Sequence, residues 1–143
     1  MTRNFSLLLL LLLVCNTLFA QEPSDAERLA NLSYMKYAEK VNCDSMSGTN
    51  LEHRVCLNLE FQRVDSILNT RFDNFIVDIE NDSTKLQLID FQQSWIVNRR
   101  RQSEVKSKGY RGHFLGIVYL DCMVKTTKMR IEELEYLMGM DEE

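Results

Sequence analysis

The chain has 143 residues, of which 17 are Lys or Arg and 21 are Asp or Glu, and 45% of its residues are hydrophobic. This length suits one small domain rather than two. A charged fraction of 27%, together with five Gly and one Pro, excludes a collagen-like chain, a disordered chain and a loop-rich fold.

The first twenty residues have the pattern of a secretory signal peptide. A cation at Arg3 precedes an apolar run from Leu7 through Cys15, and the segment ends at Ala20. A membrane-spanning helix needs about 18 or more apolar residues, and Asn16 interrupts this run too early for a stable span. We therefore expect cleavage after Ala20 and a periplasmic or secreted protein.

Processing at that position leaves a single domain of residues 21–143. It has 16 Lys plus Arg against 21 Asp plus Glu, because the removed segment carries one Arg and no acidic residue, so its net charge is −5. Cys15 faintly resembles a lipoprotein acceptor, but Val14 stands before it where a small residue is normally needed. Lipid attachment is therefore the less favoured alternative.

Three cysteines remain in the processed chain: Cys43, Cys56 and Cys122. An exported protein can keep a disulfide, and an odd number of cysteines leaves one of them free. The twelve residues between Cys43 and Cys56 contain a turn-prone stretch at 47–50, which lets the chain double back. We predict this disulfide, worth about 3 kcal/mol in the chain-entropy model, and a free thiol at Cys122.

Helical periodicity dominates the processed sequence. Ser24 to Glu27 has the pattern of a capping box and predicts a helix to about Val41. The same pattern at 49–52 indicates a short helix that enters Cys56. A longer helix is expected from about Leu57 to Glu80, where apolar residues recur at steps of 4, 3, 4, 4, 3 and 4. These residues are Leu57, Phe61, Val64, Leu68, Phe72, Phe75 and Ile79.

Two further helices are expected after a polar break at 81–84. The first starts near Leu88, reaches about Val105 and places Trp95 in the core. The second runs from about His113 to Met138 and carries a seam with alternating steps of 4 and 3. The seam residues are Leu120, Val124, Thr127, Ile131, Leu134 and Met138. The sequence thus predicts an all-α fold, a small antiparallel bundle of four main helices plus a short helix in the disulfide loop.

Several motifs follow the cysteine pair in a fixed order. They are Asp65-x-x-Leu68-Asn69-x-x-Phe72, Gln92-x-x-Trp95-Ile96-x-x-Arg99 and Cys122-x4-Thr127-x2-Arg130-x2-Glu133-Leu134. With these motifs the chain resembles the lysozyme-inhibitor LprI-like family of small exported bacterial proteins, over about residues 43–137. The resemblance implies a bacterial envelope protein that inhibits lysozyme.

The chain departs from the family pattern after Trp95. The family usually continues Trp-x-x-Tyr-Arg-Asp-x-x-Cys, where this chain has Asn98, Arg100 and Ser103. The resemblance therefore implies that a second disulfide, from Cys122 to the position of Ser103, is missing. It also implies that the basic segment beside it is less firmly tethered.

That basic segment runs from Arg99 to His113 and has a net charge of +5 over residues 99–111. One interpretation is a solvated helix end, where cations complement the helix dipole. The other is a loop that contacts the carboxylates of a lysozyme cleft. The candidate contact residues are Arg101, Lys106, Lys108, Tyr110 and Arg111. The acidic remainder of the surface could also steer a cationic lysozyme, and this interpretation is compatible with the loop contact.

A polar cluster is expected inside the bundle. Asp65 and Asn69 lie four residues apart on one helix face and can hydrogen-bond each other or Arg99. A buried polar group must find partners, so we interpret this cluster as structural.

Catalysis is not expected. The two histidines, His53 and His113, lie in different segments with no His-x3-His or Cys-x2-Cys spacing, and no phosphate-binding loop or nucleophile elbow occurs, so we predict no metal and no cofactor. An acidic exported domain also disfavours nucleic-acid binding. Two functions remain: an inhibitor that blocks a lysozyme or related cell-wall hydrolase, and a non-inhibitory envelope interaction or structural domain. The oligomeric state is left open.

Overall fold

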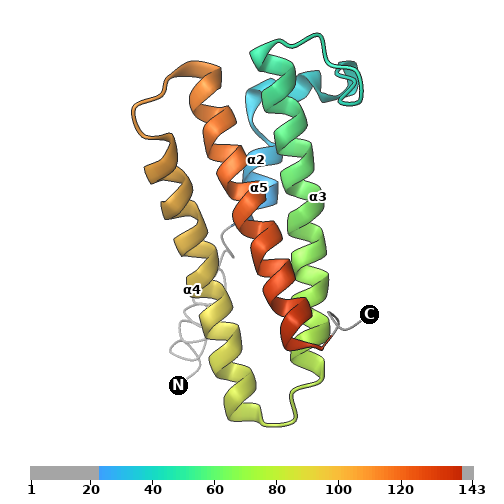
Figure 1. The fold of residues 1–143 in the computed structure, drawn as a ribbon, viewed down its shortest axis with the longest axis vertical. Coiled ribbons are helices and arrows are strands. Elements are labelled where there is room, and N and C mark those ends of the chain that lie inside the picture. Colours follow the sequence, from blue (N-terminus) through green and yellow to red (C-terminus); the bar gives the residue numbers. More distant parts are fainter. Residues whose placement is uncertain (1–22, 140–143) are drawn as a thin grey trace, which may run out of the picture.

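A computed structural model of the chain describes residues 23–139, which are helical without any strand. Short α2 (Asp25–Ala30) and the 3-10 helix η1 (Ser33–Lys40) precede three long helices, α3 (Asn50–Val77), α4 (Asp82–Ser107) and α5 (Gly112–Leu137) (Figure 1). This arrangement confirms the predicted all-α bundle. The expected signal peptide, its cleavage at Ala20 and Cys15 lie outside the described residues.

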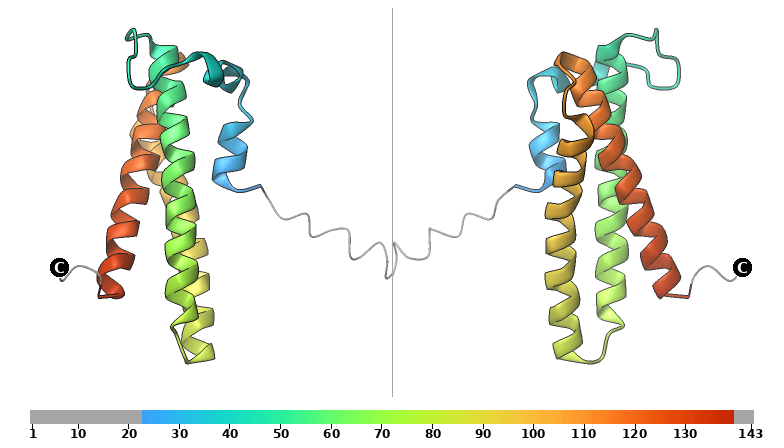
Figure 2. Two further views of the ribbon diagram at one scale, coloured as in Figure 1. Left: turned by 90° about the vertical axis from the view of Figure 1, so that its right-hand side faces the viewer. Right: turned by 60° about the vertical axis from the view of Figure 1, so that its left-hand side comes forward.

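Helix α4 runs antiparallel to α3 and α5, which run in the same direction as each other; α5 contacts both α3 and α4, while α3 and α4 hardly touch. The turn from α4 to α5 and the disulfide loop lie at one end of the bundle, and the turn from α3 to α4 lies at the other. Figure 2 shows α2 on one side of the long helices, near the end with the disulfide loop. The bundle therefore has a fourth helix along only part of its length.

The apolar core lies between α3, α5 and α2. Its central cluster consists of Leu29, Phe61, Leu120, Met123 and Val124, and further buried apolar side chains, among them Val55, Ile117 and Leu134, extend it along α3 and α5. Phe61, Val64 and Leu68 of the predicted α3 stripe are fully buried, whereas Leu57, Phe72, Phe75 and Ile79 are only half-buried. The stripe is therefore fully buried only along the part of α3 that lies beside α2. Toward the other end of α3 its side chains are only half-buried.

The prediction of one helix from Ser24 to Val41 is wrong. The capping box is present, since the Glu27 amide donates to Ser24 Oγ, but α2 ends at Ala30. The side chain of Asn58 on α3 donates to the Leu29 carbonyl at 2.9 Å and to the Tyr34 hydroxyl at 2.6 Å. This contact occupies the carbonyl of Leu29, near the end of α2. The chain then continues as η1 and does not extend α2.

The predicted short helix is not separate from the long one. A single helix, α3, begins after the Thr49 cap, where the Glu52 amide donates to Thr49 Oγ1, and passes through Cys56 without a break. No Gly or Pro stands between Thr49 and Val77 to interrupt it. The described part of the bundle therefore has three long helices and a short α2, where the sequence had predicted four main helices.

Helix α4 begins earlier than the sequence suggested and buries a different face. Asn81 caps it, because its side chain accepts from the Thr84 amide at 2.9 Å. All four buried residues of α4 are polar: Gln92, Arg99, Ser103 and Ser107. Trp95, expected in the core, is half-buried and packs against guanidinium groups.

The disulfide joins Cys43 to Cys56 across a Cα–Cα distance of 5.6 Å, as predicted, and Cys122 is a free thiol. The bond ties the loop before α3 to the first part of that helix. The Cys122 side chain is half-buried.

Replacing both Cys43 and Cys56 with Ser should lower the free energy of unfolding by about 3 kcal/mol, because the unfolded chain regains the entropy of an open loop. Urea denaturation followed by circular dichroism measures this change. Cys122→Ser is the matched control and should change stability by less than about 1 kcal/mol. Equal losses in the two variants would contradict the assignment of a structural role to the disulfide.

Candidate functional site

A buried ion cluster joins α2, α3, α4 and α5. The Asp25 side chain, fully buried in α2, accepts from Arg99 at 3.0 Å and from Arg100 at 2.7 Å, both on α4. Arg99 also donates to Asp65 of α3 at 2.6 Å and to Thr127 Oγ1 of α5 at 2.9 Å. One guanidinium thus connects α2, α3, α4 and α5, and two carboxylates compensate its charge.

Aromatic rings complete the environment of this guanidinium. Arg99 lies 5.0 Å from the ring centroid of Phe61 and 5.1 Å from that of Trp95. A second buried cation, Arg130, lies 5.9 Å from the Trp95 ring and 5.1 Å from the Phe91 ring. Cation–π contacts of this kind stabilise a desolvated cation by about 2 kcal/mol. Trp95 therefore packs between two cations instead of in an apolar core.

Arg130 is held from two sides. Its Nε donates to Gln92 Oε1 at 3.1 Å, and its Nη1 pairs with Glu133 at 2.6 Å. The residues that carried the family resemblance, including Asp65, Gln92 and Thr127, are thus largely the members of this buried polar network. Their arrangement is what a structural role requires, since each buried charge needs a partner.

The cluster keeps Asp25 ionised. Burial, the largest influence, raises the pKa of this carboxyl, but hydrogen bonds from Arg99 and Arg28 and the charges of Arg99 and Arg100 outweigh it, so that the pKa lies below its ordinary value of 3.8. Arg28 also donates to Tyr119 on α5, and burial raises the pKa of that phenol. An ionised Asp25 is therefore part of the folded state at neutral pH.

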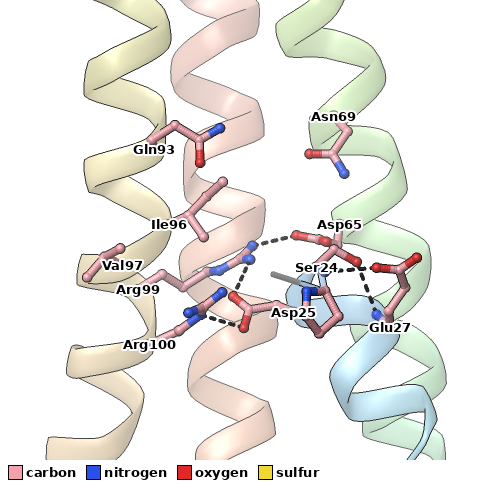
Figure 3. A pocket seen from close by; sticks show the side chains of 11 residues that line it. Ser24, Asp25, Glu27, Asp65, Asn69, Gln93, Ile96, Val97, Arg99 and Arg100 are labelled. Carbon is pink, nitrogen blue, oxygen red and sulfur yellow. Dashed lines mark hydrogen bonds and ion pairs between the residues drawn. The ribbon is translucent and has the colours of Figure 1, made fainter. Parts of the chain in front are cut away.

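A cleft of about 700 Å³ opens beside the cluster, between α3, α4 and the start of α2 (Figure 3). Ser24, Glu27, Asn69 and Gln93 supply polar groups, and Ile96 and Val97 supply apolar ones. Arg99 and Arg100 also line it, but Asp25 and Asp65 already pair with them. The cleft therefore offers little uncompensated positive charge to an anionic ligand.

The structure brings Asp65 and Arg99 together but leaves Asn69 exposed along the rim of the cleft. Sequence reasoning missed Asp25, Arg100 and Thr127. Asp25 looked like an ordinary acidic residue in the first turn of a capped helix, and its pairing with Arg99 depends on a fold-level contact. No local spacing could have revealed that contact.

The interpretation of the segment from Arg99 to His113 as a loop is wrong in its first part. Helix α4 continues to Ser107, and it buries Arg99, Ser103 and Ser107. The hydroxyls of Ser103 and Ser107 donate to carbonyls of the preceding turn, at 3.0 and 2.8 Å, so these small side chains need no partner across the interface. The segment outside helices is only the turn at 108–111.

That turn is nevertheless basic and aromatic. Lys106, Lys108 and Arg111 are exposed, and Tyr110 and Phe114 are each about half exposed. The two rings make an edge-to-face contact with centroids 5.1 Å apart. Gly109 and Gly112 adopt positive φ angles of 95° and 59°, which permit the tight reversal. We call residues 106–115 the basic tip; Phe114, four residues after Tyr110, was missed as a candidate.

Arg101 and Cys122 lie outside the basic tip but share a cavity with Lys106, its first residue. Arg101 is exposed on α4 and makes a long ion pair of 3.8 Å with Glu104. Cys122 lines a cavity of about 470 Å³ with Arg101 and four other residues of α4, and Ser103 is not among them. Ser103 instead has no exposed surface.

Within residues 23–139 no group of three or more His, Cys, Asp or Glu side chains is placed to hold a metal ion. In the same range, no helix is long and apolar enough to cross a membrane.

The comparisons with known proteins agree with the motifs. Residues 42–134 match the family described as lysozyme inhibitor LprI. The chain belongs to this family. No curated protein and no solved structure matches the chain. The match begins just before Cys43 and ends at Leu134 of α5, so it covers the disulfide loop and the three long helices but not α2 or Asp25.

Replacing Asp25 with Asn should lower the free energy of unfolding at neutral pH by about 3–5 kcal/mol, because Arg99 and Arg100 lose their shared carboxylate. Chemical denaturation measures the loss. The matched control is Asp121→Asn, which removes an exposed pair with Lys125 and should cost less than about 1 kcal/mol. A similar small loss in both variants would show that the cluster is not needed for stability.

The effect of Asp25 should depend on pH. Its folded-state pKa lies below 3.8, so its ionised form stabilises the protein above that pH, and the contribution disappears as the pH falls through the folded-state value. The difference in unfolding free energy between the wild type and Asp25→Asn should therefore shrink in acid. A difference that stays constant between neutral pH and about pH 2 would contradict an ionised Asp25.

Proposed function

We propose that this protein binds and blocks a lysozyme or a related cell-wall hydrolase, and that the basic tip makes the contact. Membership of a lysozyme-inhibitor family supports the activity. The exposed Tyr110–Phe114 pair, set among Lys106, Lys108 and Arg111, supports the location. This juxtaposition of aromatic rings and cations is the observation on which the proposal rests.

The chemistry of the tip suits the target. Lysozymes cleave glycan with two carboxyl groups in a cleft. Lys and Arg side chains pair with carboxylates through charge-assisted hydrogen bonds. Tyr and Arg are also enriched among the residues that dominate the energies of protein interfaces. The tip therefore combines groups that pair with cleft carboxylates and rings that cover apolar surface beside them.

The position of the tip makes it a better contact surface than Arg99 and Arg100. Arg99 and Arg100 are both paired with Asp25, and withdrawing Arg99 would also break the ion pair of Asp65, whose side chain is buried. The tip cations lie at the end of the bundle, where α4 and α5 turn, and their engagement does not require the helices to separate. The contact is therefore compatible with an intact fold.

Replacing Lys106, Lys108 and Arg111 together with Glu should abolish inhibition without lowering the melting temperature, because exposed side chains contribute little to stability. A turbidity assay of cell-wall lysis with purified protein and a lysozyme measures inhibition. Thermal unfolding provides the second readout.

The control is a triple reversal of Lys36, Lys40 and Lys125 to Glu, which are also exposed. It changes the net charge by the same amount, so it separates local contact from the overall attraction of an acidic protein for a cationic enzyme. Inhibition should persist in this variant. Equal loss in both variants would contradict the tip assignment, and a wild-type protein that inhibits no lysozyme would favour a non-inhibitory envelope role.

A further inference from the structure

Helix α4 is an edge helix with an exposed outer face. It packs chiefly on α5 and hardly touches α3, and its buried residues are all polar. Three of its apolar side chains are more than half exposed outside any ring contact: Leu86 at 67%, Val97 at 51% and Val105 at 74%. These residues contribute little to the core of this chain, which suggests a partner for the face that bears them.

The charges on this face are unevenly distributed along the helix. Asp82 and Asp90 lie in its first half, whereas Arg101 lies in its second half and Lys108 directly follows it; all four are exposed. Glu104, also exposed, is the one acidic residue of the second half on this side and makes a long ion pair of 3.8 Å with Arg101. Val97 and Ser94 lie between the two regions. A cationic partner would be attracted by one half and repelled by the other. A second copy of α4 running in the opposite direction would set the acidic half of each helix against the mainly basic half of the other.

The spacing specifies one register. Asp90, Ser94, Val97 and Arg101 follow each other at steps of 4, 3 and 4, which places them on one helical stripe. A two-fold axis midway between Ser94 and Val97 sets Asp90 opposite Arg101 of the second copy. The same axis sets Leu86 opposite Val105, and Ser94 opposite Val97. The small side chain of Ser94 permits close approach of the two helices at this centre.

We propose that the outer face of α4 mediates an antiparallel homodimer, with a two-fold axis between Ser94 and Val97. Such a contact is self-complementary, as a closed two-fold interface must be, and each ion pair and each apolar pair occurs twice. The helices cross at a shallow angle along a helix about 39 Å long. The basic tip lies beyond the central stripe, so this inference does not depend on the proposed inhibition.

Sedimentation equilibrium of the purified protein, with no lysozyme present, tests the dimer. The wild type should show a dimer that weakens with added salt, because the exposed ion pairs are screened. Asp90→Arg and Arg101→Asp should each raise the dissociation constant by about tenfold or more. The double variant restores opposite charges in the same register, so its dissociation constant should return toward the wild-type value.

Val97→Glu should abolish the dimer, since it sets two carboxylates near the two-fold axis. Val77→Glu is the matched control, because Val77 is 76% exposed on α3, away from this face, and its replacement should leave the dimer unchanged. A wild-type monomer at about 0.1 mM, equal weakening by both Val variants, or no recovery in the charge-swapped double variant would each overturn the proposal. The Val97→Glu variant has an unchanged basic tip, and its inhibition of a lysozyme is measured in a separate assay.

Discussion

The fold depends on the burial of one guanidinium, that of Arg99. A desolvated cation costs several kcal/mol unless opposite charge and hydrogen bonds compensate it. Here Asp25, Asp65 and Thr127 supply those bonds from three different helices, and Phe61 and Trp95 cover the faces of the group. Because α3 and α4 hardly touch, this cluster is what joins α4 to the helices other than α5. It also explains why so short a helix as α2 has a fixed place on the bundle.

The sequence predicted the fold class and much of α3 and α5 because their apolar residues repeat with helical period and meet each other in a common core. It predicted the Cys43–Cys56 bond because that pairing is local. It failed for α4, whose apolar residues suggested a core face although the helix buries Gln92, Arg99, Ser103 and Ser107 instead. It also failed at Asn31 and Leu32, where Asn58 ends α2 from a distant part of the chain. Both failures involve long-range polar contacts, which periodicity does not report.

The candidate site also separates what the sequence motifs report from what only the fold shows. The motifs of the lysozyme inhibitor LprI family fall largely on the buried network around Arg99 and Arg130, so in this chain they account for the architecture more than for a contact surface. The proposed contact lies instead at a turn that two glycines permit and that Ser107 anchors to the preceding helical turn. Recognition of the family and location of its contact surface are thus separate inferences, carried by different residues.

The measurement that most directly tests the account is hydrogen–deuterium exchange of this protein with and without a saturating lysozyme. The account predicts that amides within residues 106–115 exchange more slowly in the complex, because the partner covers the turn, while those of α2 are unchanged. Slower exchange confined to the opposite end of the bundle, around the turn from α3 to α4, would contradict it and would favour recognition of a cationic partner by acidic residues such as Asp78, Glu80 and Asp82.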